Sequence, residues 1–148
     1  MDLFGSTKTK SLNGSRYVFV LVDNFSRFTW VFFLEHKDQT FSHFKIFRKR
    51  VEKEKGFSIL KIRSDRGGGF VNQLFMTYCD EKGIKHEMSC PRTPKQNGVV
   101  ERNNRTLQEM ARTIISEYDL PQYLWAEAVN TACYISNRIY LCKNQNIF

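Results

Sequence analysis

Two runs of β-branched and aromatic residues, separated by a short polar stretch, limit most strongly what this chain can fold into. The first run, YVFVLVD, spans residues 17–23, and the second, FTWVFFL, spans residues 28–34. Such residues favour β-strands, and the Asn and Ser between the runs favour a turn. The pattern therefore predicts two consecutive strands.

Helical spacing of apolar residues alternates with further short strands along the rest of the chain. Helices are expected over residues 36–56, 70–83 and 99–118 and from Pro121 onward, and strands over residues 57–64 and 84–89. Asp38 is the expected N-cap of the first helix, and Gly56 its stop. Strands interleaved with helices predict one α/β layered domain with a mixed sheet, for which 148 residues are sufficient.

The same spacing predicts which helix faces are buried. The first helix presents Phe41, Phe44, Phe47 and Val51, the third presents Val100, Leu107, Ala111, Ile114 and Tyr118, and the last presents Leu124, Ala128, Ala132, Ile135 and Ile139. We expect these residues to pack against the sheet.

The charge balance favours a polyanionic partner. Lys and Arg number 23 against 15 Asp and Glu, which gives a net charge of +8 at pH 7. Nucleic acid is the first candidate partner and an anionic membrane surface the second. Apolar runs fall far short of the roughly 20 residues of a spanning helix, so membrane insertion is not expected. No signal sequence opens the chain, which favours an intracellular protein.

Cysteine spacing favours free thiols. Cys79, Cys90, Cys133 and Cys142 form no CxxC pair. This arrangement is typical of neither a zinc site nor a disulfide framework.

Two carboxylates stand where α/β proteins place ligand sites. Asp65 ends a predicted strand and precedes three glycines, which let a phosphate or a metal approach the backbone. Glu101 opens the helix expected from residue 99 and shares a face with Arg105, Gln108 and Arg112. From spacing alone, a solvated Glu–Arg pair and a simple Asp turn remain open as alternatives to a site.

The chain contains the segments DLFG, YVFVLVDNFSRFTWVFFL, IRSDRGGGF, YCDEKGIKHEMSCPRTPKQNGVVERNNRTLQEMART and LPQYLWAEAVNTACYISNR. Together they cover nearly the whole chain and resemble the integrase catalytic core of copia-type LTR retrotransposons. The most specific parts are the SCPRTPKQNGVVERNNRTL block and the 35 residues between Asp65 and Glu101. The resemblance implies a ribonuclease H-like α/β fold for residues 1–148, with a mixed five-stranded sheet flanked by helices.

The resemblance also implies that Asp2, Asp65 and Glu101 form an Asp-Asp-Glu triad that binds two Mg²⁺ or Mn²⁺ ions. The activity implied is 3′-end processing and strand transfer of retrotransposon DNA. Two ions suit this chemistry because they hold the attacking and leaving oxygens in line, and Mg²⁺ prefers carboxylates, water and phosphates. Asp23 also ends an apolar strand and is the rival for the first acid, although turn chemistry is sufficient reason for it.

Seven polar residues near the triad are the expected DNA contacts: Lys95, Gln96, Asn97, Arg102, Asn103, Arg105 and Gln108. Their amides and cations suit phosphates and base edges. For Arg112 a solvated face remains open, and for residues 48–55 it is preferred. The loop from Cys90 to Gly98 is expected to be mobile until DNA binds. The implied partners are element ends and target DNA, with a homo-oligomer in the full-length protein and presence in the nucleus at the integration step.

The sequence departs from the family pattern at three points. Gly69 stands where the family usually has an acidic residue. Only Met1 precedes Asp2, so the first strand is truncated and a zinc-binding domain is missing upstream. The chain also stops where a polyprotein would continue. Because each buried unpaired backbone group costs roughly 1–3 kcal/mol, we expect residues 1–148 alone to be marginally stable.

Two other functions remain open. One is a catalytically silent integrase remnant that only binds nucleic acid, and the other is a ribonuclease H-type nuclease on the same fold. The loop and helix around Glu101 favour an integrase over the nuclease.

Overall fold

A computed structural model describes residues 1–67, 69–89 and 98–145. Within these residues five strands and four α-helices alternate, as an α/β domain requires. The strands are β1 (Asp2–Phe4), β2 (Tyr17–Val22), β3 (Thr29–Leu34), β4 (Lys61–Ser64) and β5 (Lys85–Met88). The helices are α1 (Thr40–Lys55), α2 (Gln73–Lys82), α3 (Gly98–Glu117) and α4 (Trp125–Gln145), with the 3₁₀ turns η1 (Lys37–Gln39) and η3 (Gln122–Leu124) before α1 and α4.

The strands form two hydrogen-bonded sheets that meet at β1. β1, β2 and β3 pair antiparallel in that order, and β4 pairs parallel with β5. A hydrogen bond of 2.6 Å from the amine of Met1 to the carbonyl oxygen of Arg63 joins them. The five expected strands are therefore present, but as a three-stranded and a two-stranded sheet.

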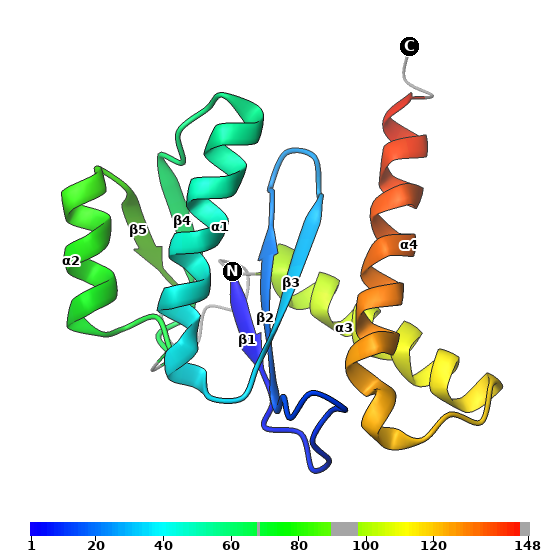
Figure 1. Cartoon of the computed structure of the whole chain (residues 1–148). Helices are drawn as coiled ribbons and strands as arrows, with labels where there is room; N and C mark the ends of the chain where they lie inside the picture. The colour runs from blue at the N-terminus through cyan, green and yellow to red at the C-terminus, as the bar shows by residue number, and fades with distance from the viewer. Residues whose placement is uncertain (68, 90–97, 146–148) are drawn as a thin grey trace.

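Helices cover both faces of the three-stranded sheet. α1 and α2 lie on one side of the strands, and α3 and α4 lie on the other (Figure 1). In β2, Phe19 and Leu21 pack in the cluster formed with α1 and α2, whereas Val18 and Val20 pack in the cluster formed with α3 and α4. All four side chains are buried, as a continuous apolar run in a doubly covered strand predicts.

The two covered faces differ in the size of their side chains. On the α1–α2 side the fully buried residues include Phe19, Phe44, Phe70 and Phe75, whose rings contact one another at centroid distances of 5.0 to 6.3 Å. On the α3–α4 side the buried residues that pack with β2 are small: Val18, Val20, Val100, Ala111, Ala128 and Val129. The larger Leu107 of α3 is buried in a separate cluster with Ala132 and Cys133. Small side chains let a helix approach the sheet closely.

Three element boundaries differ from the expectation. Asp38 lies inside η1, and α1 begins after Gln39 without a side-chain cap, so Asp38 is not its N-cap. β4 begins at Lys61 rather than at residue 57, because the N–H of Ile59 donates to the side chain of Glu52 at 2.7 Å and Phe57 is 78% exposed. α2 begins at Gln73 rather than at residue 70, because Asn72 caps it by accepting a hydrogen bond from the N–H of Phe75 at 2.8 Å. Gly56 ends α1 in the left-handed conformation, as expected.

The expected buried faces are correct near the sheet and wrong at the far ends of α3 and α4. Tyr118 is 71% exposed because α3 ends at Glu117, and Ile135 and Ile139 are 39% and 49% exposed. The last turns of α4 extend away from the rest of the molecule (Figure 1). In this part of α4 the buried residues are instead Cys133, Ser136 and Asn137.

The hydrogen bonds of Asn137 explain why α4 buries polar residues against the sheet. Its side-chain Oδ1 accepts from the N–H of Thr29 at 2.8 Å, and its Nδ2 donates to the carbonyl oxygen of Thr29 at 2.9 Å. β3 is the edge of its sheet, so the amide supplies the pairing that a further strand would give.

Cys79 and Cys133 are buried and free, as expected, and the side chains of Cys90 and Cys142 lie outside the described part of the chain. Among the described helices, none combines the length and the hydrophobicity that crossing a bilayer requires.

The Asn137→Ala variant should be markedly less stable, because the N–H of the buried residue Thr29 loses its Asn137 partner and the carbonyl of Thr29 keeps the weak thiol donor of Cys133 in place of the amide. The expected loss in the free energy of unfolding is about 3 kcal/mol, and the expected loss in Tm is roughly 6–12 °C. Thermal unfolding followed by circular dichroism measures both. Asn130→Ala, on the exposed face of the same helix, is the matched control and should change the Tm little. Equal losses for the two variants would contradict the role of Asn137.

Candidate functional site

A cleft of about 280 Å³ opens where α3 passes β1. It is lined by Asp2, Phe4, Glu101, Asn104, Arg105, Gln108 and Arg112. The members from α3 follow helical spacing, which places residues 101, 105, 108 and 112 on one face. Two of the three predicted acids, Asp2 and Glu101, are therefore brought to the same cleft from distant parts of the sequence.

Asp2 occupies a largely dry position in this cleft. Its Oδ1 accepts from the N–H of Leu3 at 2.8 Å, and its Oδ2 accepts from the side-chain amide of Asn104 at 2.5 Å. Burial raises the pKa of Asp2; the charge of nearby Asp65 acts in the same direction, and the two hydrogen bonds oppose the rise. A cation in the cleft would favour the ionised carboxylate.

Asn104 is a site residue that the sequence interpretation missed. It is 4% exposed, and its Oδ1 is a buried atom without a hydrogen-bond partner in the described part of the chain. Helical spacing contained a signal for it, because position 104 falls on the apolar face between Val100 and Leu107. A polar residue on such a face needs a partner, and here that partner is the carboxylate of Asp2.

Asp65 follows β4 directly and does not line the cleft of Asp2 and Glu101. Its Oδ1 accepts from the N–H of Gly67 at 2.9 Å. Within residues 1–67, 69–89 and 98–145, no three His, Cys, Asp or Glu side chains lie close enough together to hold a metal ion. Like-charged carboxylates repel one another, which favours separate hydrogen-bond partners for each. The three-acid metal site stays a prediction.

Asp23, the rival for the first acid, has the geometry of a turn residue. Its Oδ2 accepts from the hydroxyl of Ser26 at 2.6 Å and from the N–H of Ser26 at 3.2 Å. Burial alone would raise the pKa of Asp23, but these bonds and one from the N–H of Phe25 outweigh it and lower the pKa. The turn between β2 and β3 accounts for this carboxylate.

The residues expected to contact DNA fall into three groups. Arg105 and Gln108 line the cleft, and so does Arg112, for which a solvated face had remained open. Arg102 and Asn103 lie on α3 outside the cleft lining. Lys95, Gln96 and Asn97, with the rest of the loop from residue 90 to residue 97, lie outside the described residues.

The chemistry of the cleft fits a magnesium ion. Mg²⁺ is usually held by one or two carboxylates, with water and substrate phosphates completing its shell. Asp2 and Glu101 supply two carboxylates in one cleft, and Asn104 adds a buried oxygen that has no hydrogen-bond partner among the described residues.

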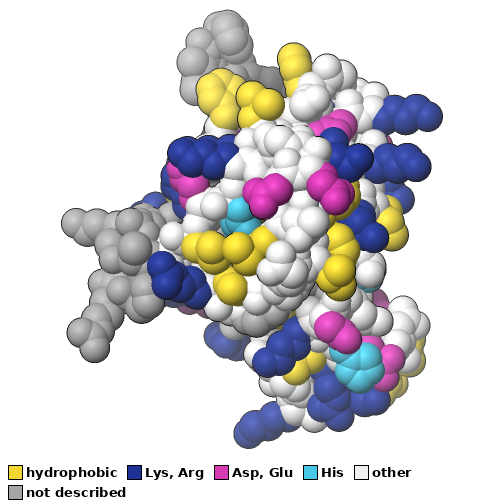
Figure 2. Space-filling model, turned by 90° about the vertical axis from the view of Figure 1, so that its left-hand side faces the viewer, with side chains coloured by type: hydrophobic (Ala, Val, Ile, Leu, Met, Phe, Trp, Pro, Cys, Tyr) yellow, Lys and Arg dark blue, Asp and Glu magenta, His cyan; other side chains and the backbone are white. Residues whose placement is uncertain are grey.

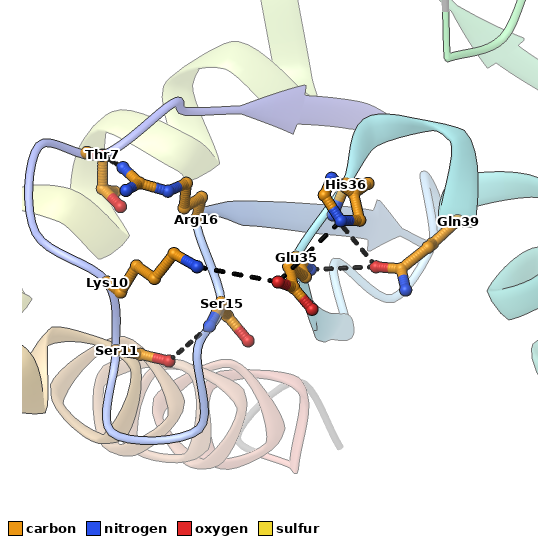
Figure 3. Close-up of polar contacts among 8 residues, drawn as sticks. All are labelled: Thr7, Lys10, Ser11, Ser15, Arg16, Glu35, His36 and Gln39. Atoms are coloured by element: carbon orange, nitrogen blue, oxygen red, sulfur yellow. Dashed lines mark hydrogen bonds and ion pairs between the residues drawn. The ribbon is translucent and has the colours of Figure 1, made fainter.

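A second cleft, of about 760 Å³, lies where β2 and β3 meet the start of α1 and α2. Lys10, Glu35 and Lys37 are among its lining residues. Figure 3 shows how its rim is held: Glu35 Oε1 lies 3.6 Å from Lys10 Nζ, and Gln39 Oε1 accepts from the N–H groups of Glu35 and His36 at 2.9 and 3.1 Å. The ion pair is half-exposed and adds little stability, so the backbone contacts of Gln39 fix this rim.

Positive charge is not confined to α3. On the face that carries α2 and β5, Lys and Arg side chains stand at many points, and hydrophobic side chains form separate small groups (Figure 2). Leu74 of α2 is 70% exposed and also lines the second cleft.

Comparison with known proteins gives consistent matches. The family profile described as "Integrase core domain" matches residues 1–94. The retrovirus-related Pol polyprotein from transposon TNT 1-94 of Nicotiana tabacum is 42% identical over 137 residues, which are 93% of this chain and 10% of that protein. The Pol polyprotein from transposon RE2 of Arabidopsis thaliana is 37% identical over 134 residues, 90% of this chain and 9% of that protein. The chain thus spans about a tenth of the length of these relatives.

Solved structures match in fold. The catalytic core domain of HTLV-2 integrase in complex with magnesium, in its dimeric form, superposes with a TM-score of 0.59 at 25% identity, covering 90% of this chain and 83% of that chain. Its trimeric form gives 0.58 at 24% identity, covering 90% and 82%. A chain of the simian T-cell lymphotropic virus intasome in complex with PP2A regulatory subunit B56 gamma gives 0.64 at 23% identity, covering 90% and 46%. These structures share the ribonuclease H-like arrangement described above.

Gly69 occupies a position where a side chain would be tightly packed. A Cβ atom there would lie 3.2 Å from Thr40 Oγ1, 3.3 Å from Leu3 Cδ2 and 3.5 Å from the carbonyl oxygen of Lys37. Thr40 is fully buried, and its hydroxyl donates to that same carbonyl at 2.6 Å, so it cannot easily move. The packing therefore explains a glycine here, where an acidic residue was the family expectation.

The Gly69→Ala variant should lose about 1–2 kcal/mol of stability because the added methyl group overpacks this contact. Chemical denaturation measures the change. Gly98→Ala is the matched control: a Cβ there would have Arg102 Nη2 at 4.0 Å as its contact, so this variant should keep or gain stability. If Gly69→Ala proved as stable as Gly98→Ala, the tight packing around residue 69 would be disproved.

Proposed function

Because the chain belongs to the integrase core domain family, in the branch of copia-type retrotransposon Pol polyproteins, we propose that it is the catalytic core of a metal-dependent polynucleotidyl transferase. The proposed reactions are 3′-end processing of element DNA and strand transfer into target DNA. The observation that carries the proposal is the cleft in which the carboxylates of Asp2 and Glu101 lie beside Arg105, Gln108 and Arg112.

Asp2, Asp65 and Glu101 are the proposed holders of one or two Mg²⁺ or Mn²⁺ ions. The HTLV-2 integrase core, a homologue, has been solved in complex with magnesium, which supports this assignment. When bound, such ions neutralise phosphate charge and activate the attacking oxygen. Asn104 keeps the carboxylate of Asp2 in the cleft through its side-chain N–H. No side-chain nucleophile is required, because the attacking group is water or a DNA 3′-hydroxyl.

The cleft face of α3 is the proposed DNA contact. Glu101 and Arg112 are separated by about 16 Å along the helix axis, the length of roughly five nucleotide steps at 3.4 Å each. Arg105 and Gln108 lie between them and offer a cation and an amide to phosphates. DNA held along this face would pass directly over the acids.

A reaction that joins two DNA segments needs a second binding surface, and the second cleft supplies a candidate. Lys10 and Lys37 line it, and so do Asn72 and Gln73 at the N-terminus of α2. Helix N-termini favour anions because their first N–H groups have no partner within the helix.

The assembly state and location follow from the same proposal. The HTLV-2 core is known in dimeric and trimeric forms, and the simian virus chain belongs to an intasome. We therefore propose that the full-length protein acts as a homo-oligomer on element ends and target DNA, and in the nucleus at the integration step.

Replacing any of the three acids should abolish strand transfer. Asp2→Asn, Asp65→Asn and Glu101→Gln should each lower the rate at least ~100-fold, since several kcal/mol of charge stabilisation are lost. Removal of Mg²⁺ by EDTA should have the same effect. The assay measures joining of labelled duplex element ends to a plasmid. Asp2→Asn should keep or raise the Tm, because burial already disfavours the ionised carboxylate.

Glu109→Gln, on an exposed part of α3 outside the cleft, is the matched control and should leave the rate unchanged. A wild-type protein that binds DNA but neither nicks nor joins it with Mg²⁺ or Mn²⁺ would instead indicate the silent binding module. Cleavage confined to RNA–DNA hybrids would indicate a ribonuclease H-type nuclease.

DNA binding should depend on salt through the proposed phosphate contacts. Arg105→Ala and Lys37→Ala should each reduce the slope of log K against log salt by about 1, and weaken binding to unrelated sequences equally. Fluorescence anisotropy at several salt concentrations measures the slope. Lys53→Ala, in the run of residues 48–55 interpreted as solvated, is the control and should leave it unchanged. A loss confined to one DNA sequence would show that Arg105 reads bases.

A further inference from the structure

Behind Asp65, a buried serine and a half-buried histidine from neighbouring strands form a polar pair. Ser64, the last residue of β4, is completely buried, and its Oγ lies 2.7 Å from Nε2 of His86 on β5. The same hydroxyl donates to the carbonyl oxygen of Asp65 at 2.9 Å. β4 and β5 lie side by side as a parallel pair, which brings the two side chains together (Figure 1).

The hydrogen-bond directions assign the protons. A serine hydroxyl has one proton, and the carbonyl of Asp65 can only accept, so we assign that proton to the Asp65 carbonyl and assign Nε2 of His86 as the donor to Ser64 Oγ. The imidazole is then the neutral tautomer protonated on Nε2. Its Nδ1 is buried and has no hydrogen-bond partner among the described residues, and burial lowers the pKa of His86, so the ring stays neutral.

We propose that His86 is a positioning residue for Asp65, acting through a buried relay in which His86 Nε2–H donates to Ser64 Oγ and Ser64 Oγ–H donates to the carbonyl of Asp65. The relay fixes the peptide group between Asp65 and Arg66. It thereby fixes the direction of the Asp65 side chain. Its importance for metal binding rests on the function proposed above, whereas its effect on the backbone does not.

Asp65 needs such a support because of where it lies. Glycines follow it from residue 67, and glycine leaves a backbone free to adopt many conformations. β1 supports β4 through the bond from Met1 to Arg63, before the strand end. On the other side, β5 pairs with β4 up to Ser64, the residue before Asp65. The N–H of Ser89 also donates to the carbonyl of Ser64 at 2.9 Å.

The histidine itself is held rigidly. Its ring packs on Phe75 with a centroid distance of 5.6 Å, and Phe75 is completely buried. Because Ser64 is also shielded from solvent, water does not compete for the relay. A change at His86 should therefore reach Asp65, although the histidine is outside the cleft of Asp2 and Glu101.

Three variants of the full chain test the relay. His86→Leu removes the donor, His86→Gln keeps a side-chain N–H, and Ser64→Ala removes the hydroxyl. Two readouts apply: hydrogen exchange of the amides of residues 65–67 in metal-free protein, and Mn²⁺ affinity by calorimetry without DNA. His43→Leu, at a half-buried histidine of α1 that contacts Phe32, is the matched control and should change neither readout.

In His86→Leu and in Ser64→Ala, exchange of these amides should accelerate about tenfold and Mn²⁺ affinity should fall roughly tenfold. The double variant should be no worse than the worse single variant, since both changes break one chain of bonds. His86→Gln should restore most of both quantities. Nitrogen NMR of the wild-type protein should show His86 protonated on Nε2.

Unchanged exchange, full additivity of the two single variants, or a Gln variant as impaired as the Leu variant would each overturn the relay, as would protonation of His86 on Nδ1. If Asp65→Asn binds Mn²⁺ as well as the wild type does, the proposed metal function fails. The exchange and NMR results then still decide whether the relay exists, so the two proposals fail separately.

Discussion

Strand β2 carries apolar side chains on both of its faces, with Phe19 and Leu21 on one and Val18 and Val20 on the other. Neither face can be left to water without losing roughly 1.5–3 kcal/mol for each large side chain. The chain must therefore send helices to opposite sides of the sheet, and it does so in sequence order, with α1 and α2 on one side and α3 and α4 on the other. Once β2 is enclosed in this way, β1 is the neighbour against which the first turns of α3 lie.

The difference between the two faces decides where chemistry can occur. Phenylalanine rings fill the α1–α2 face, so a polar group there would meet a thick aromatic layer. Where α3 and α4 pack on β2, the buried residues are Val and Ala, which brings α3 near enough for the short side chain of Asn104 to reach Asp2. A Leu or Phe at position 100 or 111 would hold the helix further away and break that contact. The small residues thus serve the cleft as well as the core.

Much of the fold could be predicted because its strongest signals are local. The β2–β3 pair, the buried stripe of α1 around Phe44 and Phe47, and the stop at Gly56 each depend on a few neighbouring residues. The exposure of Tyr118 and Ile139 could not be predicted, because it depends on how far each helix extends beyond the elements that it packs against. Asn137 and Asn104 were missed for a related reason: each satisfies a polar group on β3 or β1 from a residue more than 100 positions away.

The candidate site shows the same division between local and distant signals. The motifs around Asp65 and Glu101 drew attention to the acids, and helical spacing placed Glu101, Arg105 and Gln108 on one face. Spacing could not reveal that Asp2 would be partly buried, since its surroundings come from three separate segments.

The two sheets give the acids separate supports. Asp2 is held by β2 and by Asn104 of α3, whereas Asp65 stands at the end of β4, whose pairing partner is β5. The carboxylates repel, and burial of Asp2 makes the repulsion more costly, so folding alone does not draw them together. A rigid support behind each acid is the arrangement that can hold them ready for a cation, because the repulsion is then opposed by backbone hydrogen bonds rather than by contacts between the acids themselves. The hydrogen bond from Met1 to Arg63 is where these two supports meet.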